Sequence, residues 1–448
     1  MIRLSRGQSR LDRPAFRGLD GGLVRTLWAV PMPLKVVLLL ALGLTLGLLF
    51  PRNSLVRTLY LSGTYFPRFI VTLAALLVFH LLTAATAKLI LHHKDRAGTL
   101  FVRIVGLYVV MGVVSLIYAT GWLAALSGLP LSLPGAPLPT PGGWLRQIGG
   151  TFAHLLSQQP LLQVLGGGML TGWLTASFPG LHRAAYGFIS AGDRILSLFR
   201  KLLWYYPIMI GCLAIGIPLK FGHRGLALYG QCALWDMIVV VVWCLAMIVF
   251  CKAVTRRSWK QILSYYGTVW PTGFGTGGSY DTLAVNVISA EEDLGLSREI
   301  SEVSIVFGTV LNKNCTTMSV LIVTVIVAKL LSIPISLFEI ALLVPPVAIL
   351  GMESPGIPGG AGYFMSPIIA VLLHVPNPAL WVTTFVSVYS GLIPMFSTAG
   401  NTTDDGVVGA ILEDRLQNTH AGERTKPREG KLVPASAWEG SCPSEETN

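Results

Sequence analysis

The sequence predicts an all-α polytopic membrane protein, and its composition, its apolar runs and the way those runs are interrupted all support this fold class. Of the 448 residues, 52% are hydrophobic and only 12% are charged. Soluble domains carry roughly a quarter charged residues, so about half of the polar surface that water requires is missing here. The mean hydropathy of +0.64 agrees with this. At roughly 20 apolar residues per spanning helix, the chain is long enough for about eight spans and their connections.

Uninterrupted apolar runs fill the first part of the chain and predict ordinary transmembrane helices. The segment Pro130–Pro160 interrupts them; it is rich in Pro, Gly and Leu and almost uncharged, which predicts an extracytoplasmic loop. The six predicted spans are Leu34–Phe50, Phe66–Leu91, Phe101–Leu126, Leu161–Phe178, Leu202–Ile217 and Leu226–Phe250.

Basic residues gather at the ends of the apolar runs, and this distribution predicts the orientation. The net charge of +11 alone would be compatible with a nucleic-acid partner. However, crossings counted from a cytoplasmic N-terminus place every basic cluster on the cytoplasmic side, as the positive-inside rule requires. We therefore expect a multi-pass protein of the plasma (inner) membrane with both termini cytoplasmic, and no nucleic-acid partner. The clusters lie between residues 3 and 17, 92 and 96, 194 and 201, and 252 and 260.

Polar segments flank a single membrane domain. Residues 1–26 form a basic cytoplasmic arm, residues 27–412 form the transmembrane domain, and the polar, charged residues 413–448 predict a disordered cytoplasmic tail. Of the six cysteines, four lie in or at the end of apolar runs, and no CxxC pair occurs. Neither a disulfide framework nor a zinc site is expected.

From about Trp259 onward, four clusters of glycine and polar residues interrupt the apolar runs. They are Pro271–Thr282, Asn312–Thr317, Gly351–Gly362 and Ser397–Asp405. Unwound backbone in hydrocarbon leaves unpaired N–H and C=O groups, so it persists only where protein encloses it or where it lines a wet cavity. Four interruptions in succession predict a midplane site made from broken helices. The alternative is that each cluster is a simple loop between two shorter helices. This alternative is weaker for Asn312–Thr317, because an apolar run continues on both sides of that cluster.

These four segments carry the residues of a known family. Gly278–Ala284 reads GSYDTLA beside the family's serine-rich hairpin tip S-S-A-x-T-L-P, and Asn312–Thr316 reads NKNCT beside N-M-D-G-T. Residues 356–359 read GIPG beside G-V-P-G, and Pro394–Asp405 reads PMFSTAGNTTDD beside D-x-x-R-T-x-x-N-V-T-G-D. From about Leu34 to Leu412 the chain therefore resembles the dicarboxylate/amino acid:cation symporters, a family of sodium:dicarboxylate and glutamate carriers.

The resemblance implies a complete architecture and a mode of action. Eight transmembrane helices would be joined by two re-entrant helical hairpins, with helices seven and eight broken, and residues 259–412 would form the substrate and ion core. It also implies a homotrimer, an elevator-type alternating-access mechanism, and a solute of the dicarboxylate or amino acid type. No cofactor is expected beyond the coupling ion, Na⁺ or H⁺, and the partners are the solute, that cation and the lipid bilayer.

The resemblance also assigns the solute site and shows where this chain departs from the family. The family's arginine, which would clamp a side-chain carboxylate, falls at Ser397, and the aspartate that meets an amino group falls at Pro394. A neutral or atypical solute therefore becomes an alternative to an acidic one. The residues expected to bind the solute are Ser279, Thr316, Gly356, Pro358, Ser397, Thr398 and Asn401.

The implied cation sites are altered as well. One sodium site would use carbonyl groups of Gly308, Asn312 and Asn401 with the carboxylate of Asp405, and all four residue types are present. A second site is lost, because its aspartate is Asn314 here and Met111 and Gly112 stand where the third span needs hydroxyl groups.

Lys313 replaces a methionine beside the implied ion path. An ionisable group inside the membrane costs roughly 3 kcal/mol on insertion scales, so it is a functional candidate with an expected carboxylate partner. The candidates for that partner are Asp281, Glu353 and Asp405. Its ammonium either takes the place of a sodium ion as a structural group or takes part in coupling; the sequence leaves both open.

We therefore expect a cation-coupled secondary active transporter. The main alternative is a non-transporting membrane sensor or scaffold with a decayed pocket, since three family residues are replaced at once. An intramembrane enzyme is not expected, because neither Ser279 nor Cys315 has a histidine nearby in the sequence.

Overall fold

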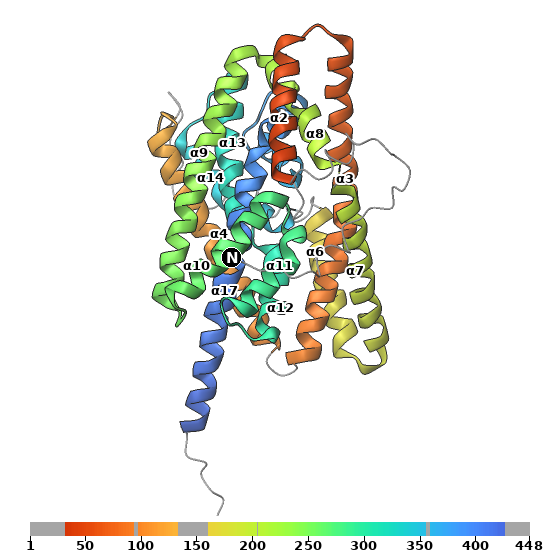
Figure 1. The fold of residues 1–448 in the computed structure, drawn as a ribbon, viewed down its shortest axis with the longest axis vertical. Coiled ribbons are helices and arrows are strands. Elements are labelled where there is room, and N and C mark those ends of the chain that lie inside the picture. Colours follow the sequence, from red (N-terminus) through yellow and green to blue (C-terminus); the bar gives the residue numbers. More distant parts are fainter. Residues whose placement is uncertain (1–31, 94–96, 133–159, 204, 355–358, 426–448) are drawn as a thin grey trace, which may run out of the picture.

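The computed structural model describes residues 32–93, 97–132, 160–203, 205–354 and 359–425. Within these ranges all regular structure is helical, and most helices run along the long axis of the molecule (Figure 1). The predicted all-α class is confirmed. In chain order the helices are α2 (Met32–Leu49), α3 (Ser54–His93), α4 (Ala97–Leu126), α6 (Pro160–Ser177), the 3₁₀ turn η3 (Pro179–Leu181), α7 (His182–Leu203), α8 (Tyr206–Ala214), α9 (Gly216–Val254), α10 (Trp259–Thr276), α11 (Ser279–Glu292), α12 (Arg298–Leu311), α13 (Asn314–Leu331), α14 (Leu337–Glu353), α15 (Gly360–Leu372), α16 (Pro378–Tyr389) and α17 (Leu392–Thr425).

Five of the six early predicted spans lie in helices: α2, α3, α4, α6 and α9. The fifth prediction, Leu202–Ile217, is wrong as a single helix, because it covers the end of α7, the nine-residue α8 and the start of α9. Pro207 at the start of α8 explains the interruption, since proline fits the first turn of a helix and not its interior. Most of the predicted loop 130–160 lies outside the described residues.

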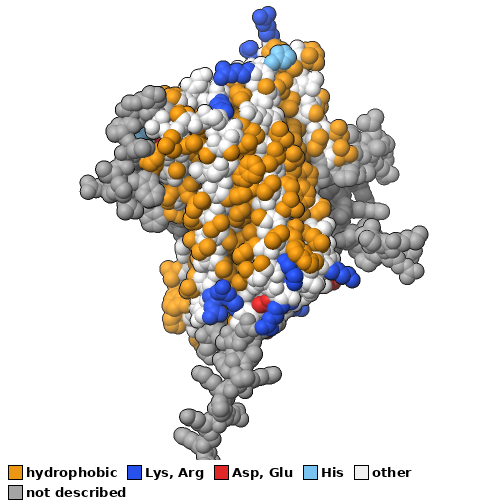
Figure 2. All heavy atoms as spheres, turned by 90° about the vertical axis from the view of Figure 1, so that its left-hand side faces the viewer, with side chains coloured by type: hydrophobic (Ala, Val, Ile, Leu, Met, Phe, Trp, Pro, Cys, Tyr) orange, Lys and Arg blue, Asp and Glu red, His pale blue; other side chains and the backbone are white. Residues whose placement is uncertain are grey.

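Three described helices are long and apolar enough to cross a membrane: Gly98–Leu126, Gly216–Val254 and Arg298–Leu331. The bent pair Pro378–Tyr389 and Leu392–Leu416 makes a fourth if it counts as one span. On the side of α9 and α10, apolar side chains cover the middle of the surface while Lys and Arg lie toward its two ends (Figure 2). This is the surface expected of a bilayer-spanning protein. The number of eight spans stays a prediction.

Glycines bring the peripheral helices together. A Cβ at Gly43 of α2 would collide with the backbone of Gly211 in α8, and a Cβ at Gly168 or Gly172 of α6 would collide with the backbone of α3. Lipid chains are as apolar as leucine, so membrane helices associate through close backbone approach at small residues. The pairs α2–α8 and α3–α6 are packed in this way.

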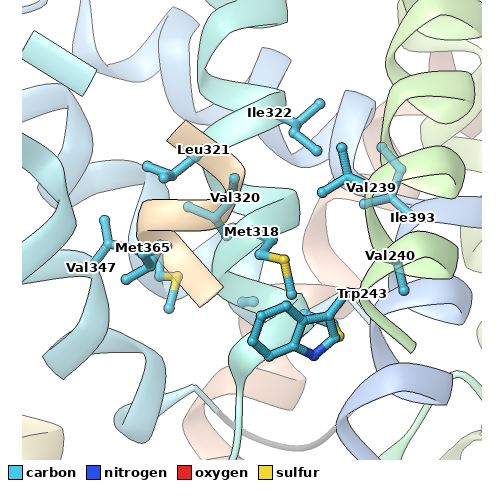
Figure 3. Packing of buried hydrophobic residues seen from close by; sticks show 14 of the residues in the cluster. Val239, Val240, Trp243, Met318, Val320, Leu321, Ile322, Val347, Met365 and Ile393 are labelled. Carbon is cyan, nitrogen blue, oxygen red and sulfur yellow. The ribbon is translucent and has the colours of Figure 1, made fainter. Parts of the chain in front are cut away.

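Helix α13 lies at the centre of the largest buried cluster. Its residues Met318, Val320, Leu321 and Ile322 lie between α9 on one side and α14 and α15 on the other, where Val347 and Met365 contact them (Figure 3). In the span Arg298–Leu331, 89% of the most apolar window is buried, against 33% in Gly98–Leu126 and in Gly216–Val254. Helix α13 is therefore enclosed by protein.

Two helical hairpins and two broken helices form the last third of the chain, as predicted. Helices α10 and α11 meet at Gly277 and Gly278, where Gly277 has φ 63°. Helices α12 and α13 are separated only by residues 312 and 313. Helices α14 and α15 form the second hairpin, and residues 355–358 of its tip lie outside the described residues. The predicted interruptions at Asn312–Thr317 and at both hairpin tips are confirmed.

The predicted break within Ser397–Asp405 is wrong. That segment lies in the continuous helix α17, and the chain instead bends by 68° at Ser390 and Gly391. Hydroxyl groups of Thr402 and Thr403 donate hydrogen bonds to carbonyls of their own helix. Polar side chains are therefore accommodated in the enclosed helix without unwinding it.

Helix α17 also continues beyond the predicted end of the membrane domain. The tail was expected to be disordered from Glu413, but the helix extends to Thr425. The Glu413 carboxylate accepts hydrogen bonds from the backbone N–H and the hydroxyl of Ser297 (3.0 and 2.7 Å), and Asp414 forms an ion pair with Arg257 (3.4 Å). These contacts fix the first turn of the predicted tail; residues after 425 lie outside the described part.

Candidate functional site

A pocket lies where the two hairpin tips meet the two broken helices. It holds about 250 Å³ of space not filled by protein atoms, part of which is open to solvent. The first hairpin contributes Ser279, the break after α12 contributes Lys313, and the start of α17 contributes Ser397. The complete described lining is Gly277, Ser279, Lys313, Thr316, Ser354, Gly359, Ala361, Tyr389, Pro394, Ser397, Thr398 and Asn401.

Of the seven residues expected to bind the solute, the structure brings five to this pocket: Ser279, Thr316, Ser397, Thr398 and Asn401. The other two, Gly356 and Pro358, lie outside the described residues. The pocket wall near Ser397 and Pro394 carries no cationic or acidic side chain among the described lining residues apart from Lys313. The replacement of the family's arginine and aspartate at these positions stays a prediction.

Asn401 joins α17 to the start of α13. Its side-chain oxygen accepts hydrogen bonds from the backbone N–H groups of Cys315 (2.8 Å) and Thr316 (3.4 Å), and its amide nitrogen donates to the Thr316 hydroxyl (2.7 Å). The N–H groups of Asn314 and Thr317 are bonded to the Asn312 side chain and to the Lys313 carbonyl. All four N–H groups of the first turn of α13 therefore have protein acceptors.

The N-termini of α11 and α15 differ from that of α13. Their cap residues, Gly278 and Gly359, have no side-chain hydrogen bond to the helix, and both ends reach the pocket through Gly277, Ser279, Gly359 and Ala361. The first N–H groups of a helix have no acceptor within it, and the helix dipole favours an anion there. Two such ends directed at one pocket suit a carboxylate.

Asn312 connects the residues of the predicted sodium site. Its amide nitrogen donates to the Asn401 carbonyl (2.8 Å) and to the Asp405 carboxylate (2.8 Å), and its backbone N–H donates to the Gly308 carbonyl (2.8 Å). A Cβ at Gly308 would collide with Asp405 and Tyr108, so only glycine permits this approach. The four residues expected to surround a cation thus lie together.

Lys313 lies beside them with its side chain turned toward α12. Its ammonium donates to the carbonyls of Thr309 (2.6 Å), Val310 (3.1 Å) and Asn312 (3.1 Å). The residue is 4% exposed. Among the described side chains none forms an ion pair with it, although Asp405 acts on it electrostatically. Asp281 lies in the first turn of α11, and the side chain of Glu353 is outside the described part.

The oxygens of the predicted sodium site already accept hydrogen bonds in this conformation. Each of them accepts a hydrogen bond from Asn312 or Lys313, so protons of an amide and an ammonium point at the oxygens that would surround a metal. Each carbonyl oxygen has a second lone pair, and the carboxylate has several, so binding of sodium here stays a prediction.

The second, altered cation site contains a residue that the sequence analysis missed. Asn314 faces α4, where Gly112 approaches its side chain and the Ser115 hydroxyl lies 3.4 Å from its carbonyl. On the other side its amide nitrogen donates to the Asp404 carboxylate (3.1 Å), which also accepts from the Trp243 indole N–H (2.9 Å). Asp404 stands where the family motif has glycine. A carboxylate absent at Asn314 is therefore present at the facing position of α17.

Asp236 of α9 is a further acid that the sequence analysis missed. It is fully buried, and neither of its oxygens has a hydrogen-bond partner in the structure. A single charged residue inside the apolar run Leu226–Phe250 was the available signal for it. The doubled aspartate at 404 and 405 was the corresponding signal in α17.

Comparison with known proteins decides the family. The model of the sodium:dicarboxylate symporter family matches residues 32–415. The chain belongs to this family. The resemblance inferred from the four interrupted segments is thereby confirmed, and the glutamate-transporter-like polytopic membrane fold agrees with it.

Individual relatives are distant. An excitatory amino acid transporter of Onchocerca volvulus is 23% identical over 236 residues, which cover 52% of this chain and 47% of that protein. An excitatory amino acid transporter of Caenorhabditis elegans is 22% identical over 236 residues, covering 52% of this chain and 46% of that protein. The chain spans about half the length of the curated relatives it matches. These relatives are transporters and not enzymes.

Proposed function

We propose that this protein is a secondary active transporter that moves a small organic carboxylate across the membrane, driven by a cation gradient. The observation that carries the proposal is the pocket between the two hairpin tips and the two broken helices, with the uncapped ends of α11 and α15 directed into it. Backbone of this kind is tolerated inside a membrane only where protein or a water-filled cavity surrounds it. Membership of a symporter family supports the same function.

The proposed solute carries one carboxylate. The ends of α11 and α15, together with the Ser279 hydroxyl, provide donors for it. A second carboxylate would lie near Ser397, which cannot replace a bidentate guanidinium. A protonated amine would lie near Pro394, which has no acidic group. Monocarboxylates therefore suit the pocket better than aspartate or a dicarboxylate.

Alternating access would carry this site between the two sides of the membrane. By family resemblance, the first, second, fourth and fifth spans form a fixed scaffold and trimer contact, and the remaining elements move. The largest buried cluster includes Val36 and Leu40 of α2 and Leu82 of α3 together with α13, so the division rests on the resemblance alone.

Uptake into proteoliposomes tests the function. Purified full-length protein is reconstituted, and labelled lactate, pyruvate, succinate and aspartate are supplied under an imposed sodium gradient or an imposed pH gradient. We expect at least one monocarboxylate to accumulate above its equilibrium level under one of the gradients. Loss of a bidentate charge pair costs several kcal/mol, so aspartate should be taken up at least about 100-fold less efficiently.

Two results would contradict the proposal. Equilibration of every solute without accumulation under either gradient would exclude coupled transport. Solute-dependent thermal stabilisation without any uptake would favour the sensor alternative.

A further inference from the structure

Helix α12 ends in the interior of the protein, and its last carbonyls need donors. The last four C=O groups of a helix have no partner within it, and in a membrane protein water does not supply one. Here the Gly308 carbonyl accepts from the N–H of Asn312 (2.8 Å). The Thr309 and Val310 carbonyls accept from the Lys313 ammonium.

Every N–H donor of the Lys313 ammonium forms a hydrogen bond in this position. The ammonium has three N–H donors, and the third bonds to the carbonyl of Asn312 in the break (3.1 Å). The positive charge lies at the C-terminus of α12, where the helix dipole favours a cation. Asp405 provides the opposite charge, and Asn312 links the two, because its carbonyl accepts from Lys313 and its side chain donates to Asp405.

The backbone N–H groups that follow the break, at the start of α13, have hydrogen-bond acceptors as well. The first four N–H groups of α13 bond to the side chains of Asn312 and Asn401 and to the Lys313 carbonyl. Helices α12 and α13 remain nearly in line, since Arg298–Leu331 qualifies as one span of 34 residues. The carbonyls of Gly308, Thr309 and Val310 and these four N–H groups are therefore bonded without a metal ion.

We infer that the ammonium of Lys313 is a tethered cation that permanently occupies the carbonyl cage at the end of α12 and takes the place of a sodium ion there. The solute pocket is then organised without sodium at this position. The inference rests on the proposed function, because it assigns the ion requirement of the same site.

A tethered charge changes the energetics of transport. A mobile cation crosses the membrane with the solute and dissociates on the other side. A membrane potential of 100 mV can therefore raise the accumulation ratio of the solute about 40-fold for each charge that crosses. Lys313 returns with the empty carrier and contributes no such factor. Coupling must come from a cation bound elsewhere.

Thermal unfolding of the full chain in detergent tests this without any solute, using sodium itself as the probe. Sodium chloride is titrated against choline chloride at constant ionic strength for the wild type and for Lys313→Met. The wild type should show no sodium-specific rise in its unfolding midpoint. Lys313→Met should show a saturable rise of at least about 2 °C, because a ligand that binds only the folded state stabilises it.

Lys329→Met is the matched control. Lys329 lies in the same helix α13, and its ammonium donates to the Ser127 carbonyl (2.9 Å) near the surface, away from the break. This variant should lack the sodium response. Lys313→Gln, which keeps an amide donor and removes the charge, should respond like Lys313→Met.

Every other pattern overturns the inference. A sodium response in the wild type as large as in Lys313→Met means that the ammonium does not occupy the position. A folded Lys313→Met without any response means that the cage does not accept sodium. If both charge-removing variants fail to fold even in sodium, the metal does not substitute for the ammonium. Absence of solute uptake by the wild type would instead count against the proposed function alone.

Discussion

The two broken helices of this protein differ in shape and in what satisfies their backbone. Across the break between α12 and α13, which we call the straight break, the 34 residues Arg298–Leu331 pass as one span without a bend above 40°, whereas the break between α16 and α17, the bent break, turns the chain by 68°. At the straight break a lysine and two asparagines bond the free carbonyls and N–H groups. At the bent break Gly391 adopts φ 94°, and the Tyr229 hydroxyl donates to the Ser390 carbonyl (3.2 Å).

This difference separates two tasks. A straight break keeps opposite helix ends facing each other, so it needs charged and amide side chains to satisfy them. A bent break turns the following helix, and the first turns of α17 thereby bring Pro394, Ser397 and Thr398 to the pocket. We interpret the first break as the part that holds a fixed positive charge beside the pocket and the second as the part that shapes the solute pocket.

Replacement of Asn401 should give the largest effect, because this residue connects the two broken helices. Asn401→Ala removes the acceptor for the Cys315 and Thr316 N–H groups and the donor to the Thr316 hydroxyl. Buried groups left without partners cost about 1–3 kcal/mol each. We expect uptake in proteoliposomes to fall by about 100-fold.

Thr403→Val is the control for this change. Among the residues that the structure describes, the Thr403 hydroxyl donates only to the Ala399 and Gly400 carbonyls of its own helix. Uptake should stay within about twofold of the wild type, since such back-bonding adds little to stability. Equal losses in the two variants would show that Asn401 does not connect the breaks.

Replacement of Gly391 should affect stability next most strongly. In Gly391→Ala the new Cβ would lie 2.8 Å from the Tyr229 hydroxyl and 3.0 Å from a Leu40 methyl group, at a φ that disfavours side chains. We expect the free energy of unfolding, measured by denaturant titration, to fall by about 2–4 kcal/mol. Gly230→Ala in α9 has open space around its Cβ and should instead stabilise by up to about 1 kcal/mol. A neutral Gly391→Ala would contradict the role of glycine in the bent break.

An exchange of side chains between Asn314 and Asp404 tests whether their hydrogen bond stabilises the straight break. Asn314→Asp alone places two carboxylates where a hydrogen bond of 3.1 Å now joins an amide to a carboxylate. It should lower the free energy of unfolding by about 2 kcal/mol or more. Asp404→Asn in addition restores one amide and one carboxylate, with the Trp243 N–H still bonded. We expect the double variant to recover most of the loss; strictly additive losses would show that the two positions do not interact.

The sequence allowed the straight break to be predicted and not the bent one. Asn312, Lys313 and Asn314 stand within a long apolar run, where polar residues at consecutive positions are incompatible with a lipid-facing helix. The bent break has little polar character, reading Tyr389–Ser390–Gly391–Leu392, whereas the helical segment after it is rich in polar residues. An enclosed polar helix and an unwound segment both need surrounding protein, so polarity alone does not distinguish them.

The sequence predicted most residues of the site, but it did not predict the hydrogen bonds between them. Five of the seven solute residues line one pocket, and the four predicted sodium-site residues lie together. The hydrogen bonds that these oxygens accept depend on the direction in which the side chains of Lys313 and Asn312 turn. Spacing along the chain does not specify that direction. Asp404 and Asp236 were missed because each becomes notable only when its neighbours on other helices are known.

Alternating access of the pocket is the central claim, and the accessibility of residue 397, which lines the pocket, tests it most directly. Ser397→Cys would be made with Cys212 and Cys442 replaced by serine; the other native cysteines in the described residues are buried. A membrane-impermeant maleimide is then applied to oriented vesicles from either side. We expect labelling from both sides, slowed at least about tenfold from each by a transported solute, because a bound solute covers residue 397 in the pocket. Labelling from one side only, at a rate indifferent to the solute, would contradict the account.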